Sequence, residues 1–215
     1  MANIEIRRYS SRDKKRIIDI CYKTGYMGED LTPLNLFNDR NLFAQLFCLY
    51  YLRYEADNCF VAALNDEAVG YIIGATNTKR QRICFALLAA APILLRSLFY
   101  TSWKYPESFK AFMHFVSNGD LSSEPEKLNA NYPAHLHINI LPEYQHLGIG
   151  SSLLKAFEKE MAKKNIRGIH LKTSNKNGKA IPFYIKNGYS IIYEKEERVW
   201  KGVNDYKGLI FGKKL

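Results

Sequence analysis

The sequence predicts an α/β fold, in which helices flank one sheet and a helical insertion separates its third and fourth strands. Two observations support this class. Short β-rich runs alternate with amphipathic helical patterns along the 215 residues. A strand pattern, a glycine-containing turn and a helix pattern also follow one another directly between Pro133 and Lys164. Length and a hydrophobic fraction of 47% agree with a single domain over residues 1–215 with its own core.

The elements follow from local patterns taken in chain order. Ile4 and Ile6 alternate with polar residues in a first strand, and Gly25 ends the helix that follows it. The pair of runs around Asn65-Asp66-Glu67 predicts a hairpin. The expected strands cover residues 3–9, 59–64, 68–75, 134–141, 168–171, 189–193 and 209–211. The expected helices cover residues 11–24, 39–54, 86–100, 107–117, 149–164 and 176–186.

Residues 79–133 contain no strand pattern and are expected to be an insertion that helps to cover a site. Within it, the stretch 119–133 has the polar composition of a loop. The aromatic residues of the helix expected at 39–54, including Tyr50 and Tyr51, recur every three or four residues. They are expected to pack in the core, with the alternative that some of them line an acceptor pocket.

Composition restricts the partners of the protein. The net charge of +10 fits either a basic surface or an anionic ligand, and no long basic run typical of nucleic-acid-binding tails occurs. The four cysteines form no C-x-x-C pair and no zinc spacing with histidine, so we expect buried reduced thiols, no metal and a cytoplasmic protein. No signal peptide and no membrane partner are expected, because the most apolar run, residues 84–95, is short.

The turn before the helix at residue 149 is a candidate phosphate-binding site. Glycines allow backbone N–H groups to point into a concavity, and a helix N-terminus adds partial positive charge. A P-loop would need Gly-Lys-Ser/Thr, whereas Ser151 and Ser152 follow Gly150 directly. A dinucleotide fingerprint would need a third Gly or Ala where Leu153 stands. Both of these motifs are excluded.

The remaining match is the Q/R-x-x-G-x-G/A turn of the GNAT acetyltransferases. Leu141–Gly150 resembles the pyrophosphate loop of that family, and Asn177–Tyr189 resembles its N-x-x-A-x-x-F-Y-x-x-x-G-F/Y segment. Two motifs in the family order, each on the expected element, are a specific signal. The insertion together with Tyr132–His137 also resembles, more narrowly, the acetyltransferase-like domain of O-GlcNAcase and its bacterial relatives.

The resemblance implies a GNAT acyl-CoA N-acyltransferase fold, with a mixed, twisted sheet and acetyl-CoA in an opening between the fourth and fifth strands. Backbone groups near Ile138 and Ile140 would pair with the pantetheine arm, and Asn177 would bond to the amide chain of the cofactor. The pyrophosphate would be held by the N–H groups of Gln145, His146, Leu147, Gly148, Ile149, Gly150 and Ser151. Gln145 replaces an Arg that is common in the family, which removes one positive charge.

The reaction requires two proton transfers, because an amine of pKa ~10 must lose a proton and a leaving thiolate must gain one. Tyr184 occupies the family position of the general acid, with a core aromatic as the alternative. His135 and His137 share a strand face with Asn139 and are candidates for the base, with a structural role as the alternative. Many relatives have a carboxylate on this strand, and this strand has none.

We therefore expect an acetyl-CoA-dependent N-acetyltransferase that acts on a small-molecule or peptide primary amine by direct attack. The alternative is a non-catalytic acyl-CoA-binding or protein-interaction module with the same fold. Nucleic-acid binding is a third and weaker hypothesis. A homodimer formed through an exposed strand edge is compatible with the sequence.

Overall fold

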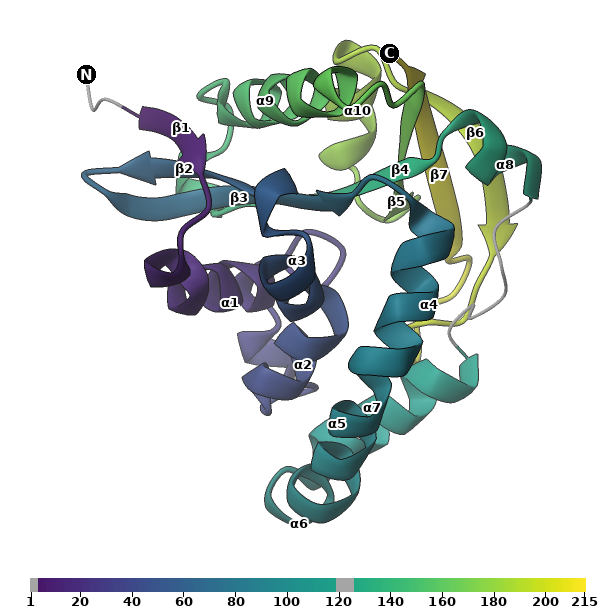
Figure 1. Ribbon diagram of the computed structural model, residues 1–215. Coiled ribbons are helices and arrows are strands. Elements are labelled where there is room, and N and C mark those ends of the chain that lie inside the picture. Colours follow the sequence, from purple (N-terminus) through teal and green to yellow (C-terminus); the bar gives the residue numbers. More distant parts are fainter. Residues whose placement is uncertain (1–3, 119–125) are drawn as a thin grey trace.

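The computed structural model describes residues 4–118 and 126–215 and contains one seven-stranded sheet in the order β1-β2-β3-β4-β5-β7-β6 (Figure 1). All neighbouring strands are antiparallel except β4 and β5, which are parallel, so the expected mixed sheet is confirmed. The strands are β1 (Ile4–Arg8), β2 (Phe60–Leu64), β3 (Glu67–Ala75), β4 (Ala134–Ile140), β5 (Gly168–Ser174), β6 (Ser190–Glu196) and β7 (Lys207–Lys214).

Helices cover both faces of the sheet. One face carries α1 (Lys14–Lys23), α2 (Arg40–Phe47) and α3 (Leu49–Tyr54), and the other carries α9 (Ile149–Lys163) (Figure 1). The alternation of β3 supplies both cores, because Tyr71 and Ile73 pack with α1 and α2, whereas Ile72 packs with α9. The core on the α9 side also includes Tyr184 of α10 (Ala180–Lys186). Short 3₁₀ turns occur at Ser11–Asp13, Thr32–Leu34, Ala56–Asn58 and Pro142–Tyr144.

Two of the expected boundaries differ from the structure on the α1 side and at the end of the chain. The helix predicted over residues 39–54 is interrupted at Cys48, whose ψ of −35° and φ of −135° break the α-helical run into α2 and α3. The last strand, expected at 209–211, runs from Lys207 to Lys214 because it pairs with both β5 and β6.

The segment between β3 and β4 is helical, as predicted, and extends away from the sheet in Figure 1. It consists of α4 (Thr78–Leu88), α5 (Ala90–Arg96), a π-helical turn (Ser97–Thr101), α6 (Ser102–Lys104), α7 (Pro106–Asn118) and α8 (Glu126–Asn131). The prediction was wrong about the start of the first helix, because the Asn77 side chain accepts from Arg80 N–H and caps α4 eight residues earlier than expected.

The polar stretch 119–133, expected as a loop, contains α8, and its residues 119–125 lie outside the described part of the chain. Leu128 of α8 is buried, and the carbonyl of Asn131 lies 2.5 Å from the position of a Cβ on Gly168. Contact with the start of β5 therefore orders a segment whose own composition predicts no helix.

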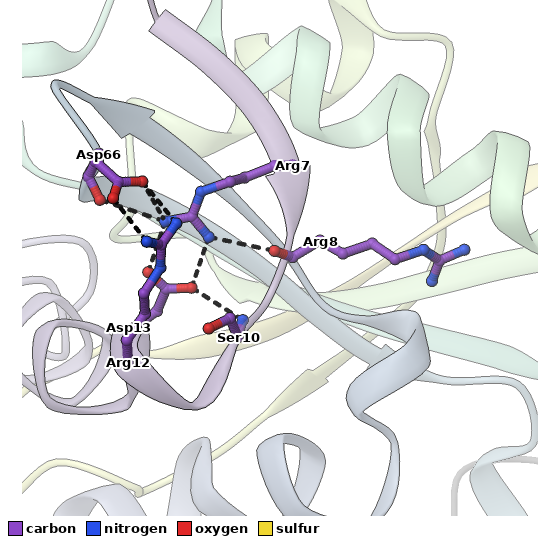
Figure 2. Close-up of polar contacts among 6 residues, drawn as sticks. All are labelled: Arg7, Arg8, Ser10, Arg12, Asp13 and Asp66. Carbon is purple, nitrogen blue, oxygen red and sulfur yellow. Dashed lines mark hydrogen bonds and ion pairs between the residues drawn. The ribbon is translucent and has the colours of Figure 1, made fainter.

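A polar cluster joins β1, the start of α1 and the β2–β3 turn (Figure 2). Arg7 donates to both carboxylate oxygens of Asp13 at 2.7 and 2.8 Å, and Asp13 accepts the Ser10 N–H at 2.9 Å. Arg12 binds Asp66 in the turn at 2.7 and 2.6 Å. Burial alone would raise the pKa of Asp13, but its hydrogen bonds from Arg7 and Ser10 lower that pKa below its usual value.

Candidate active site

The parallel strands β4 and β5 separate soon after they begin. Their pairing is confined to Ala134 with Ile169 and His135 with His170, although β4 continues to Ile140 and β5 to Ser174. Beyond His135 the backbone of β4 is paired on the β3 side only. The opening that the resemblance implied between the fourth and fifth strands is therefore confirmed.

The hydrogen-bond register of β3 and β4 determines which backbone groups face this opening. Leu141 N–H donates to Val69 O at 3.0 Å, so Leu141 and Val69 form a hydrogen-bonded pair. Hydrogen-bonded and non-hydrogen-bonded pairs alternate in an antiparallel ladder. Ile138 and Ile140 therefore direct their N–H and C=O groups away from β3, toward the opening. Pairing of these groups with a pantetheine arm stays a prediction.

The turn after β4 places the N-terminus of α9 beside the opening. Within α9, Ser152 N–H makes a helical bond to Gly148 O at 3.1 Å, so the N–H groups of Ile149, Gly150 and Ser151 precede the helical ladder and have no acceptor in the helix. Gly148 has a φ of +79°, and a Cβ there would meet no atom within 4 Å. The turn thus presents backbone donors to open space at a helix N-terminus, which fits a pyrophosphate.

Gln145 has a different part in this turn from its neighbours. Its N–H donates to Pro142 O at 3.2 Å and its side-chain amide donates to Ile140 O at 3.1 Å. Both donors therefore hold the turn against the end of β4. Among the turn residues expected to bind a pyrophosphate, His146, Leu147 and Gly148 are therefore the ones whose N–H groups could do so beside the helix N-terminus.

A cleft of about 450 Å³ occupies the opening. Its walls come from four parts of the chain: the α1–α2 connection, β4, the turn with the start of α9, and the segment from Asn177 through α10. The residues are Thr24, Gly28, Ile138, Asn139, Ile140, Gln145, His146, Gly148, Gly150, Ser151, Asn177, Lys179, Ala180, Pro182, Phe183, Tyr184 and Lys186. None of these wall residues is acidic. Two are lysines, of which Lys179 is ion-paired with Glu29 at 2.8 Å, so Lys186 and the backbone donors are what suits the cleft to an anionic ligand.

Tyr184 and Asn177 reach the cleft from the far side. Tyr184 is buried against Tyr189 and Phe211, with ring centroids 6.1 and 5.5 Å away, and it also lines the cleft. Burial raises the pKa of the Tyr184 phenol, so the phenol keeps its proton at neutral pH. Asn177 Oδ1 accepts the Ala180 N–H at 3.1 Å, so the asparagine also holds the start of α10.

The two histidines of β4 share one face with Asn139, as predicted, and that face is turned toward α1 and α3. Tyr51 Oη lies 2.7 Å from His135 Nε2 and 3.2 Å from His137 Nε2. Asn139 donates through its side-chain amide to the hydroxyl of Thr24 at the end of α1. Tyr51 therefore connects the two imidazoles.

Thr78 determines the protonation pattern of this cluster. Its hydroxyl donates to Pro133 O at 3.0 Å and lies 2.8 Å from His135 Nδ1, so Nδ1 of His135 must carry the hydrogen in that contact. Burial, together with the nearby His137 and His170, holds the pKa of His135 well below its usual value. His135 is therefore neutral, and its Nε2 accepts from Tyr51.

The same reasoning assigns the tautomer of His137. Tyr51 has a single hydroxyl hydrogen, which it donates to His135, so Tyr51 accepts from Nε2–H of His137. Nε2 of His137 therefore carries a hydrogen. His135 uses both ring nitrogens within the protein. Neither histidine is among the residues that line the cleft, whereas Asn139 on the same strand face is.

Sequence reasoning missed Thr78, Thr24 and Gly28, which come from the connections that follow β3 and α1. Position in the chain gives no signal that Thr78 and Thr24 contact β4 or that Gly28 lies beside Asn177. Tyr51 was covered only as part of an aromatic stripe whose expected role was core packing, and it is indeed buried. Its hydroxyl contact with the histidines depends on the packing of α3 over β4. Among the described residues, no group of three or more His, Cys, Asp or Glu could hold a metal ion.

Comparison with known proteins agrees with this geometry. Residues 26–189 match the model of the acetyltransferase (GNAT) family. The spermidine N(1)-acetyltransferase of Thermoplasma acidophilum is 38% identical over 65 residues, which are 30% of this chain and 40% of that protein. The match thus spans less than half the length of that curated relative.

Solved structures share the fold over nearly the whole chain. The crystal structure of SsHAT superposes with a TM-score of 0.76 at 25% identity and covers 99% of this chain and 98% of its own. PaiA N-acetyltransferase from Thermoplasma acidophilum, in complex with coenzyme A, superposes with a TM-score of 0.55 at 18% identity, with 99% of both chains covered. The family model covers most of the chain, including β4, the turn, α9 and α10, so this protein belongs to the acetyltransferase (GNAT) family.

Proposed function

We propose that this protein is an acetyl-CoA-dependent N-acetyltransferase that transfers the acetyl group to a primary amine by direct attack. The observation that carries the proposal is the cleft at the separation of β4 and β5, with a helix N-terminus on one side and the Tyr184 phenol on the other. Membership of the family agrees with this activity, and the name of the matched relative specifies an amine acceptor.

Backbone groups would hold the cofactor. The N–H groups of His146 through Ser151 would bind the pyrophosphate, and Lys186 would add positive charge nearby. Ile138 and Ile140 present backbone donors and acceptors along the opening, which suits the amide-containing pantetheine arm. Acetyl-CoA supplies a thioester, whose carbonyl carbon is open to attack by a neutral amine.

Tyr184 and His137 would manage the two protons. His137 takes, directly or through a water, the proton that the amine loses as its nitrogen bonds to the acetyl carbon. Tyr184 gives its proton to the sulfur as the carbon–sulfur bond breaks. A phenol whose pKa is raised by burial still holds that proton at neutral pH. We propose His137 rather than His135, because His135 uses both nitrogens in contacts with Tyr51 and Thr78.

A thiol-release assay with acetyl-CoA and a panel of amines tests the proposal. The panel includes spermidine, amino acids, aminoglycosides, and peptides with free N-termini or lysines. We expect at least one amine to release coenzyme A. Tyr184→Phe should lower that turnover about 100-fold while the dissociation constant for acetyl-CoA, from calorimetry, changes little. Unchanged turnover in Tyr184→Phe would remove this residue as the acid.

One observation favours a second candidate, a non-catalytic acyl-CoA-binding module. The β4 strand, Ala134–Ile140, has no carboxylate to act as a base, and one of its two histidines is fully engaged. This candidate predicts calorimetric binding of acetyl-CoA without thiol release for any amine in the panel. Turnover of any amine that depends on Tyr184 would exclude it.

A further inference from the structure

The helices between β3 and β4 expose an unusual amount of apolar surface. Leu87, Phe99 and Trp103 are 75%, 77% and 83% exposed. Other large apolar side chains on the same helices are also exposed; together with these three they form what we call the apolar insertion surface: Ile83, Leu87, Leu88, Leu94, Leu95, Leu98, Phe99 and Trp103. An exposed apolar set of this size on one contiguous segment is typical of an interaction site.

The orientation of this segment is set by a buried polar contact on its opposite side. Asp39, the N-cap of α2, is 2% exposed and accepts from Arg96 at 2.9 and 2.8 Å and from Thr101 Oγ1 at 2.7 Å. Ser108 of α7 accepts the Asp39 N–H at 3.1 Å. Thr101 and Ser108 are fully buried, whereas Phe99 and Trp103 face solvent. The inner side of these helices buries Thr101 and Ser108 together with Ile93 and Phe112, and the outer side still exposes large apolar side chains, unlike the outer face of a helix that meets only water.

The charge of the same segment restricts what can cover it. Residues 68–106 contain no Asp or Glu, and the basic residues among them are Lys79, Arg80, Arg82, Arg96 and Lys104. Arg96 is ion-paired with Asp39. Lys79 and Arg80 at one end of the apolar run and Lys104 at the other are exposed to solvent. The surface thus combines leucine, phenylalanine and tryptophan with positive charge. Its complement is both apolar and anionic.

We infer that the apolar insertion surface docks on the interface of an anionic lipid bilayer. A helix with Trp, Phe and Leu on one side and Lys or Arg beside them is the type that lies in such an interface. A second copy of this chain is a poorer complement, because a two-fold contact through this surface would bring the positive charges of both copies to one interface while residues 68–106 supply no acidic partner for them. This inference goes against the expectation from sequence that the protein has no membrane partner.

The segment would lie on the bilayer rather than cross it. No single described helix is long and apolar enough to span a membrane, although Thr78–Leu88 and Ala90–Lys104, bent by 45° at their break, reach that threshold as a pair. The ion pair between Arg96 and Asp39 ties the middle of this pair to α2. Insertion to full depth would have to break that contact, whereas shallow docking leaves it intact.

Vesicle sedimentation with the full chain tests the inference. The probes are vesicles of phosphatidylcholine alone and vesicles in which about one-third of the lipid is phosphatidylglycerol. We expect binding to the anionic vesicles, at least 10-fold weaker binding to the neutral ones, and loss of binding as salt is raised. In a Trp200→Phe background Trp103 is the single tryptophan, and its fluorescence should shift to shorter wavelength when anionic vesicles are added.

Two pairs of variants separate the contributions of apolar surface and charge. Phe99→Ser with Trp103→Ser should weaken binding to anionic vesicles at least 10-fold, whereas Ile191→Ser, at an exposed apolar position on β6, should leave it unchanged. Lys79→Glu with Lys104→Glu should also weaken it. Lys155→Glu with Lys159→Glu, which changes the net charge equally on the exposed side of α9, should have a much smaller effect.

Several outcomes would overturn the inference. One is absence of binding to anionic vesicles by a folded, monomeric wild-type protein. Another is equal loss of binding in the α9 control, which would indicate unspecific attraction by the net charge. A third is self-association in sedimentation velocity that Phe99→Ser with Trp103→Ser abolishes, without vesicle binding, since the occupant would then be a second copy. Circular dichroism of each variant shows that a loss of binding is not a loss of fold.

Discussion

At the scale of single residues, the cluster on β4 shows that two histidines on one strand face differ in their hydrogen-bond partners. His135 and His137 differ only by one step along the same strand face, and both contact Tyr51. Thr78 adds a second contact to His135 and so makes it a fixed, neutral acceptor. His137 contacts Tyr51 through Nε2, whereas the Thr78 contact that fixes an acceptor is made by His135. The two histidines are therefore expected to respond very differently to substitution.

His137→Gln should lower kcat/KM about 100-fold and remove the rise in rate that an imidazole base produces between acidic and neutral pH. His135→Gln should preserve the shape of the pH–rate profile and instead lower the free energy of unfolding by about 1–2 kcal/mol, because it disrupts buried hydrogen bonds. Steady-state kinetics across pH and urea denaturation of both variants measure the difference. Equal pH profiles for the wild type and His137→Gln would exclude His137 as the base.

At the scale of elements, the start of α9 and the side of α10 form the two walls of one cleft. Gly150 lies in the first turn of α9, and a Cβ on it would come within 2.8 Å of the Phe183 ring and 3.3 Å of Ile140 Cδ1. The two walls can therefore approach only because this position has no side chain. A Cβ on Gly178, in the segment before α10, would meet no atom within 4 Å, so this glycine serves as a matched control.

Gly150→Ala should displace the Phe183 ring toward the cleft and weaken binding of acetyl-CoA about 10-fold. Its cost in stability should be small, since the end of an aromatic side chain can move and alanine favours a helix. Gly178→Ala should leave the dissociation constant unchanged within about twofold. Isothermal titration calorimetry measures both, and equal affinities for the two variants would show that Gly150 does not shape the cleft.

The position of the inserted helices depends on the buried ion pair between Asp39 and Arg96. Asp39→Asn should remove the charge partner of Arg96 and lower the free energy of unfolding by about 3 kcal/mol, as expected for a broken buried ion pair. Amides of α5 through α7 should lose hydrogen-exchange protection more than those of the sheet. Lys110→Gln, which removes an exposed ion pair with Glu107, should change stability by less than about 0.5 kcal/mol. Uniform loss of protection across the chain would contradict a local role for Asp39.

At the scale of the whole molecule, two buried carboxylates join separate segments of the chain. Asp13 joins the start of α1 to β1, and Asp39 joins α2 to the inserted helices. Burial alone would raise both pKa values, but hydrogen bonds from Arg7 and from Arg96 and Thr101 lower them below the usual value of 3.8. A carboxylate with a lowered pKa stabilises the fold above the pKa of the unfolded chain, and that contribution is lost as pH falls through the folded pKa.

The free energy of unfolding should therefore depend little on these two groups above about pH 5 and should fall steeply below the usual aspartate pKa. Urea denaturation at a series of pH values measures this dependence. Asp13→Asn should be less stable than the wild type at neutral pH and should show a shallower decline in acid. An identical acid slope in the variant and the wild type would show that Asp13 does not couple protonation to folding.

Local patterns were sufficient for much of the fold. All seven strands and the helices α1, α7, α9 and α10 overlap the ranges that alternation, helical periodicity and glycine stops predict, although α10 begins at Ala180 rather than at 176. These signals work because they reflect which face of each element is buried. The errors have tertiary causes. Contact with β5 orders α8, a cap at Asn77 lengthens α4, and pairing on both sides lengthens β7.

For the site, the sequence alone determined the chemical inventory: a glycine turn before a helix, a tyrosine on the last helix and two histidines on one strand face. These follow from residue types and short-range spacing. The tertiary structure alone decided that β4 and β5 separate after His135, that Tyr51 and Thr78 make His135 structural, and that Asp39 turns the apolar side of the inserted helices outward. Each of these depends on contacts between residues far apart in the chain, to which local periodicity does not respond.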